Sequence, residues 1–176
     1  ADVVVTYNGQ AFDTRVLNRE FLLAKMLPPS PYKQIDLYRV VTDRFDFPIK
    51  KLDYVLKRLG FKGKVRHPGF QMWIDCAAGD ERAWAKMAAY NQRDTTELEQ
   101  LYTVLRPWVR NHPNTGAFDG RPDACPTCGE EHKLQRRGFA VTRDVKYPRF
   151  QCGGCGSWLR GKKAVDSTRT TLQGVA

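Results

Sequence analysis

The chain has no apolar run approaching the roughly 20 residues that a membrane-spanning helix needs. Its first residues do not form the charged, apolar and small-residue leader that directs secretion. We therefore expect a soluble, cytoplasmic protein with no membrane partner. Long polar low-complexity tracts are also missing, and a hydrophobic content of 41% argues against wholesale disorder.

Acidic residues are scarce, with 19 Asp and Glu against 29 Lys and Arg, which gives a formal net charge of +10. Most of this excess lies in residues 106–176. A charge of this size attracts polyanions and speeds their encounter, so nucleic acid is the natural candidate partner. The alternative is that the charge only keeps the protein in solution.

Cysteine is limited to five residues, four of which form two C-x-x-C-G motifs. Two intervening residues allow one tight turn to place both sulfurs about 2.3 Å from the same ion, and the following Gly tolerates the turn. The motifs predict a structural zinc site. Substitution of His132 for one ligand, or redox-active pairs, are the alternatives, and the lone Cys76 is expected to be a buried thiol. The zinc ligands would be Cys125, Cys128, Cys152 and Cys155.

The N-terminal part predicts an α/β unit. Residues 2–7 read as a buried strand, followed by a turn at Asn8 and a helix from Phe12 to Met26. The chain begins at this strand with no preceding turn, so we expect the natural product to extend upstream. Further helices are predicted at 35–41, 52–59 and 81–105, and residues 61–78 are expected to be a loop in which Trp73 and Cys76 contribute to the core.

The long helix carries polar residues within its apolar stripe. Asn91 and Asp94 interrupt the series Met87, Leu98, Leu101, Leu105, and Tyr90 lies one turn before Asp94 on the same face. A carboxylate on a core-facing side is costly unless it is paired or binds a metal. Asp94 is therefore either a ligand or a residue bonded to a neighbouring Arg or loop amide.

Asp13 is a second candidate, because it follows the first strand at the opening of a helix. In open α/β sheets the ligand crevice lies outside the carboxyl ends of the strands. A carboxylate at a helix N-terminus is also an ordinary partner of the helix dipole.

The segments Tyr7 to Asp13 and Tyr90 to Asp94, read as N-x-x-x-F-D and Y-x-x-x-D, resemble the second and third motifs of the DnaQ-like 3′-to-5′ exonucleases. The variant with a Tyr in the third motif is the nearest, in its bacteriophage form with an appended zinc ribbon. The resemblance covers residues 1–110 and implies a partial RNase H-like exonuclease fold of class α/β. It also implies a bacterial or phage-infected cell.

By this resemblance, Asp13 and Asp94 would bind magnesium or manganese, and Tyr90 would orient the attacking water. Asn8 and Phe12 would lie near the terminal nucleotide. The first motif of the family, an Asp-x-Glu, has no counterpart in these residues. We therefore expect little catalysis from this chain alone: it is part of a longer protein, a separate polypeptide supplies the motif, or the protein has become a binding module.

The C-terminal part predicts a small β-rich zinc ribbon at 122–163, after a linker at 111–121 and before a tail at 164–176. Phe150 and Trp158 are expected to fill its small core, with zinc supplying most of the folding energy. Basic residues of the ribbon are expected to bind nucleic acid, namely Arg136, Arg137, Arg143, Lys146 and Arg149.

The favoured hypothesis is a metal-dependent 3′-to-5′ exonuclease acting on DNA, single-stranded or at a 3′ end, with RNA possible as substrate. A replication protein, or a separate chain supplying the missing motif, would be its partner. The alternative is a noncatalytic nucleic-acid-binding or replication accessory protein.

Overall fold

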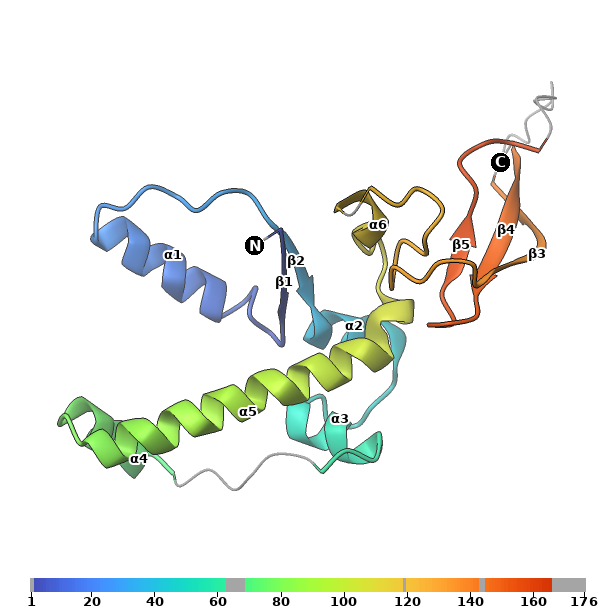
Figure 1. The fold of residues 1–176 in the computed structure, drawn as a ribbon. Helices are drawn as coiled ribbons and strands as arrows, with labels where there is room; N and C mark the ends of the chain where they lie inside the picture. Colours follow the sequence, from blue (N-terminus) through green and yellow to red (C-terminus); the bar gives the residue numbers. More distant parts are fainter. Residues whose placement is uncertain (1, 63–68, 119, 143–144, 166–176) are drawn as a thin grey trace, which may run out of the picture. The chain divides into compact units, whose positions relative to one another are not determined.

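The structure is a computed structural model, and it describes residues 2–62, 69–118, 120–142 and 145–165. The chain forms two compact units, Ala1–Leu105 and Arg106–Ala176, and each is described by itself. The first unit is mixed α/β and the second is mainly a small antiparallel sheet (Figure 1). None of the described helices is long and apolar enough to cross a membrane.

The first unit is built on two parallel strands, β1 (Val3–Thr6) and β2 (Lys33–Asp36), with Val3 opposite Lys33. Parallel strands need a crossover, which here contains helix α1 (Asp13–Leu23). The predicted strand, turn and helix are confirmed, but the strand, expected to be buried, is only half-buried. No residue of α1 is fully buried in the described structure: Leu17 and Leu22 are exposed, and Val16 and Phe21 are half-buried.

Four more helices complete this unit: α2 (Leu37–Arg44), α3 (Leu52–Arg58), α4 (Gln71–Ala77) and α5 (Glu81–Leu105). The long helix and the helix at 52–59 are confirmed. The helix expected from residue 35 is wrong at its start, because residues 35 and 36 pair with β1 and helix α2 begins only afterwards.

The expectation of a loop over residues 61–78 is wrong for α4, which packs against α5. Cys76 and Met72 of α4 form a buried cluster with Ala83 and Met87 of α5. Cys76 is thus the predicted buried thiol, whereas Trp73 is 52% exposed and does not belong to the core. On a helix, Trp73 lies between the buried positions and turns outward.

The second unit contains the 3-10 helix η1 (Arg106–Trp108), helix α6 (Thr115–Phe118) and three strands in the order β3 (Leu134–Val141), β4 (Lys146–Cys152), β5 (Trp158–Arg160). All neighbouring strands are antiparallel. The segment interpreted as a linker contains α6, where the Thr115 N–H donates to the Pro126 carbonyl at 2.8 Å. Residues 166–176 of the predicted tail lie outside the described part of the chain.

The Asp36 carboxylate joins the end of β2 to the loop that follows β1. It is only 6% exposed and caps α2 by accepting a hydrogen bond from the Tyr38 N–H at 3.1 Å. It also accepts from the Asn8 N–H at 2.7 Å and from the Gln10 N–H at 3.2 Å. Asn8 has a φ of 63°, so this carboxylate holds the loop in a conformation that few residues adopt.

We expect Asp36→Ala to lower the free energy of unfolding by about 2 to 3 kcal/mol, because three backbone donors lose their acceptor. Urea denaturation followed by far-UV circular dichroism measures this loss. The matched control is Glu20→Ala, which removes an exposed carboxylate paired with Arg19 and should change stability by less than about 0.5 kcal/mol. Equal effects of the two substitutions would contradict the structural role of Asp36.

Candidate carboxylate hollow and cysteine metal centre

A hollow of about 330 Å³ lies where the chain leaves β1 and passes α5. The carboxyl ends of β1 and β2 both point toward the middle of α5 in Figure 1. Asp94 and Asn91 of α5 therefore meet the end of β1, as expected for a crevice at the carboxyl ends of parallel strands. The hollow is lined by Tyr7, Leu52, Asn91, Asp94, Thr95 and Leu98.

Tyr7 forms one wall of this hollow and is held firmly. Its hydroxyl donates to the Lys50 carbonyl at 2.6 Å, and its ring contacts Tyr38 edge-on with centroids 5.7 Å apart. Burial, with smaller contributions from Tyr38 and Asp36, raises the pKa of Tyr7 above its usual value. Tyr7 thus stays protonated and serves as a wall of the site. No role was predicted for Tyr7, although its position directly after an apolar strand indicates a place at the carboxyl end of that strand.

The second predicted carboxylate, Asp13, lies apart from the lining of the hollow. It is the first residue of α1 and is exposed. Phe12 beside it is 65% exposed, and Asn8 is exposed with its backbone N–H bound to Asp36. The structure thus brings Asn91 and Asp94 together in one hollow and places Asp13, Asn8 and Phe12 on the loop and helix start that follow β1.

On α5 the expected core-facing position of Asn91 is wrong, because this residue is exposed. Asp94 and Tyr90 are half-buried, one turn apart. The buried polar residue of the helix is Glu97, which is 7% exposed and accepts a hydrogen bond from the Arg93 Nε at 3.2 Å. The ion pair between Arg93 and Glu97 was not predicted, although the i,i+4 spacing of the two residues indicates it.

The donors at the hollow suit a hard divalent cation in kind, since Asp94 and Asn91 offer oxygen. Among the described residues, neither Asp13 nor Asp94 belongs to a group of three or more His, Cys, Asp or Glu side chains able to share an ion. The described chain thus supplies only part of a ligand set there.

The four cysteines do form such a group, with their sulfurs all within 4.8 Å of one another. The Cys125 and Cys155 sulfurs are 3.8 Å apart, and those of Cys128 and Cys152 are 3.7 Å apart. A tetrahedron with metal–sulfur bonds of about 2.3 Å has edges of about 3.8 Å. Disulfide sulfurs would be about 2.05 Å apart. The spacing therefore fits a four-thiolate metal such as zinc.

The two knuckles have the backbone that the motifs predict. Gly129 and Gly156 have φ values of 74° and 79°, and their N–H groups donate to the Cys125 and Cys152 carbonyls at 2.8 Å. The predicted need for Gly after each pair is confirmed. The His132 side chain is 95% exposed, so it lies outside the sulfur cluster.

Burial raises the pKa of the Cys125 and Cys128 thiols in the metal-free chain. Burial also opposes ionisation of Cys152, but hydrogen bonds from the backbone of Cys155 and Gly154 lower its pKa to about 7. The Cys125 and Cys128 thiols are thus protonated at neutral pH without a metal, and a bound cation must displace their protons.

A family model for the RNase H superfamily matches residues 1–106. The chain belongs to the RNase H superfamily. The match ends at the boundary between the two units. Searches of curated proteins and of solved structures found no match.

Membership of the RNase H superfamily suggests nuclease-type activity on nucleic acid, and this fold typically uses divalent metal ions. The hollow at the end of β1 lies inside the matched region and offers oxygen donors of the required kind. The cysteine centre lies outside the matched region.

In the second unit of this RNase H superfamily chain, predicted basic residues lie beside aromatic rings. Arg136 and Lys146 lie 5.3 Å and 4.1 Å from the centre of the Phe139 ring. Arg149 lies 5.0 Å from the Trp158 ring, and its Nε donates to the Arg137 carbonyl at 2.9 Å. Arg143 falls outside the described residues.

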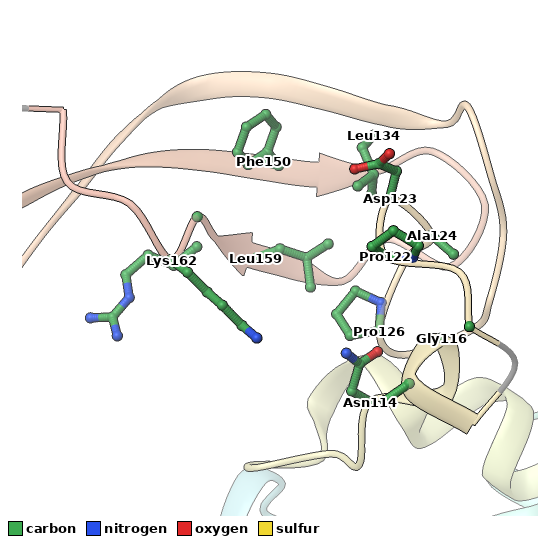
Figure 2. Close-up of a pocket in the computed structure, with 14 residues that line it drawn as sticks. Asn114, Gly116, Pro122, Asp123, Ala124, Pro126, Leu134, Phe150, Leu159 and Lys162 are labelled. Atoms are coloured by element: carbon green, nitrogen blue, oxygen red, sulfur yellow. The ribbon is translucent and has the colours of Figure 1, made fainter.

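The two aromatic residues expected to fill the ribbon core differ in their environment. Phe150 is half-buried and lines a groove of about 1140 Å³ with Leu134 and Leu159. Figure 2 shows Leu159 and the end of Lys162 facing Pro126 and Asn114 across this groove. Trp158 is 56% exposed, so its expected core position is wrong. Phe150 pairs with Leu159, and Trp158 is the next residue along β5, so Trp158 lies on the opposite face of the sheet from Phe150.

We expect the purified chain to carry one zinc ion and Cys128→Ser to lose it, because a hydroxyl is a poor ligand for zinc at this site. Elemental analysis measures the metal, and the dispersion of amide NMR signals from residues 120–165 reports folding of the second unit. The matched control, Cys76→Ala, removes a cysteine of the first unit and should keep the zinc. Full zinc content in Cys128→Ser would contradict the four-thiolate centre.

Zinc affinity should fall steeply as the pH is lowered. Because the pKa values of Cys125 and Cys128 are raised, acid keeps these thiols protonated and the ion must compete with more protons. Competition with a chromogenic chelator between about pH 8 and pH 6 measures the change, with a loss of tenfold or more expected for each pH unit. An affinity independent of pH would show that the thiols are not the ligands.

Proposed function

We propose that this chain is the nuclease part of a metal-dependent 3′-to-5′ exonuclease that acts on single-stranded DNA or on a 3′ end. The observation that carries the proposal is the hollow where Asp94 meets the end of β1, within the region that matches the RNase H superfamily. RNA stays a possible substrate class, since nothing in this hollow distinguishes a 2′-hydroxyl.

Asp94 and Asp13 are the residues that would hold magnesium or manganese. Divalent ions of this kind, when bound, lower the pKa of a water and stabilise the leaving oxygen of a phosphodiester. Asp94 offers a carboxylate fixed on the long helix α5, half-buried beside Tyr7. Asp13 offers a second carboxylate in the first turn of α1, directly after the loop that Asp36 holds.

Three further residues have supporting roles in the proposal. Tyr90 lies one helical turn before Asp94, so its hydroxyl is suited to orient the attacking water near that carboxylate. Phe12 and Asn8 lie exposed beside Asp13. The exposed ring of Phe12 can pack against the sugar or base of the terminal nucleotide. The side-chain amide of Asn8 can form hydrogen bonds with the edge of that base.

Two carboxylates are few for a site that binds two divalent ions. The proposal therefore includes further carboxylates from outside these 176 residues, from an upstream Asp-x-Glu or from a separate chain. To complete the site, such carboxylates would need to lie beside the end of β1, next to the hollow that Tyr7 lines.

The test uses the protein extended upstream through its reading frame until an Asp-x-Glu after an apolar strand is included. We expect manganese-dependent shortening of a 3′-tailed, 5′-labelled oligonucleotide, and Asp94→Asn should lower kcat by about 10³-fold because a metal ligand loses its charge. The matched control, Glu99→Gln, neutralises an exposed carboxylate on the same helix and should leave the rate within about twofold. Activity that survives Asp94→Asn rejects the assignment.

A noncatalytic nucleic-acid-binding protein is the second candidate. The observation favouring it is that, among the described residues, neither Asp13 nor Asp94 belongs to a group of three or more side chains able to share an ion. The upstream reading frame separates the two candidates: a missing Asp-x-Glu, together with nucleic-acid binding that needs no divalent ion, supports the binding protein.

A further inference from the structure

The basic residues predicted as one set are divided between the two faces of the ribbon sheet. Cross-strand partners share a face, and alternate residues along a strand lie on opposite faces. The pairs Arg136 with Phe150 and Phe150 with Leu159 define one face, which lines the groove (Figure 2). We call this the groove face. Phe139 and Lys146 also belong to it, because they pair with Pro148 and Val141 in the same alternation.

The opposite face, here called the outer face, carries a different set of residues. Gln135 pairs with Gln151, Gln151 with Trp158, and Arg149 with Arg160. The bulge after Arg136 keeps Arg137 on this side, where its guanidinium donates to the Gln135 side chain at 2.7 Å. The outer face includes Arg137, Tyr147, Arg149, Gln151, Trp158 and Arg160, together with Gln135 and Ala140.

Cations and rings alternate along the outer face. The guanidinium of Arg149 lies 5.0 Å from the centre of the Trp158 ring, and that of Arg160 lies 4.5 Å from the Tyr147 ring. Trp158 is 56% exposed, so its ring presents area to solvent although it contacts an arginine. The result is a ladder of two aromatic rings and two guanidinium groups on one surface.

This ladder is electrostatically unfavourable without an anion. Arg149 and Arg160 are direct cross-strand partners, and like charges in this position repel. The three strands contain no Asp or Glu, so no carboxylate within the sheet offsets them. Cation–π contacts orient the guanidinium groups without neutralising them. A polyanion is the ligand class that removes the repulsion.

The rings restrict the polyanion to a strand with accessible bases. Tyr147 and Gln151, the partner of Trp158, are four residues apart on β4, which spans roughly 13 Å at about 3.3 Å per residue. Bases can stack on both rings only if they are unpaired, because a duplex hides their faces. The planar guanidinium groups between the rings match the fork geometry of phosphate oxygens.

We propose that the outer face of the ribbon, with Trp158, Arg149, Arg160 and Tyr147 at its centre, binds an unpaired nucleic-acid strand. Bases stack on the two rings and phosphates bond the two arginines. The groove face, with Arg136 and Lys146, does not take part. This inference deepens the proposed function by naming an unpaired strand as the substrate. It rests on the proposed function only in taking the bound strand to be the one that is cut. Binding itself needs neither Asp13 nor Asp94.

The test measures the affinity of the full chain for a labelled oligonucleotide of about twelve thymidines by fluorescence anisotropy, with no added magnesium or manganese. Zinc content of every variant is determined first, so that loss of the ribbon fold is recognised. The double variant Arg149→Gln with Arg160→Gln should bind at least about tenfold more weakly. The slope of log affinity against log salt concentration should become shallower by about 1.4. Each phosphate contact on a single strand contributes about 0.7 to this slope, and the variant loses two contacts.

The matched control removes the same charge from the groove face. Arg136→Gln with Lys146→Gln should weaken binding by less than about threefold, because only the general attraction of the chain changes. Equal losses in the two double variants would show that net charge alone attracts the strand and would overturn the proposal.

Stacking is tested by Trp158→Ala, which should weaken single-strand binding about tenfold, and by Trp158→Phe, which should restore most of it. Binding to a duplex of the same length should hardly respond to either change. Unchanged single-strand affinity in Trp158→Ala, with zinc retained, would overturn the proposal. Binding is measured without magnesium or manganese, and cleavage by the upstream-extended protein is measured separately, so failure of the nuclease assignment and failure of this inference are separate outcomes.

Discussion

The Asp36 carboxylate is the interaction on which the first unit depends. It ends β2, caps α2 and accepts the N–H groups of Asn8 and Gln10, so one buried charge ties together two strands' carboxyl ends. A buried carboxylate is tolerable only when its lone pairs are occupied, and here three backbone donors occupy them. The loop that it holds leads from Tyr7, in the wall of the hollow, to Asp13 at the start of α1. Asp36 therefore fixes the loop between the hollow that contains Asp94 and the start of α1 at Asp13.

The second unit follows another constraint. Cys152 is the only buried residue among the described parts of its three strands, so these strands bury little apolar surface. Sheets of this size do not hold together by hydrophobic burial alone, and metal binding then supplies folding free energy. The four sulfurs already have the spacing of a tetrahedral site. Because the sheet has no substantial core to protect, both of its faces are available to polar and aromatic residues, and that is why Trp158 is exposed.

Features encoded within a short stretch were predictable from the sequence. Helix α5 has a clear start at Glu81 and a sustained apolar period, and each knuckle is complete within five residues. Features that depend on distant partners were missed. Ile35 and Asp36 form a strand only because β1 lies beside them, about thirty positions earlier in the chain. In the site, the apolar stripe on α5 indicated a polar residue facing the core. It could not distinguish Asp94, at the edge of the core, from Glu97, inside it. The burial of each residue depends on which neighbouring elements cover that turn of the helix. The cations of the ribbon were correctly seen as clustered, yet the bulge at Gly138 and the alternation of strand residues divide them between two faces.

The proposed division of labour between the two units has an energetic consequence. A hollow of about 330 Å³ with Asp94 as its one lining carboxylate offers little area for holding a polymer, whereas the outer face of the ribbon offers aromatic rings and guanidinium groups. If the ribbon binds a strand as proposed, its contacts would be the same before and during bond cleavage and would stabilise the bound substrate and the transition state equally. Such uniform binding lowers KM without raising kcat. The covalent link between the units would also raise the effective concentration of a bound strand at the first unit. On this proposal, substitutions in the ribbon change how long the strand stays bound, and substitutions at the hollow change how fast each bond is cut.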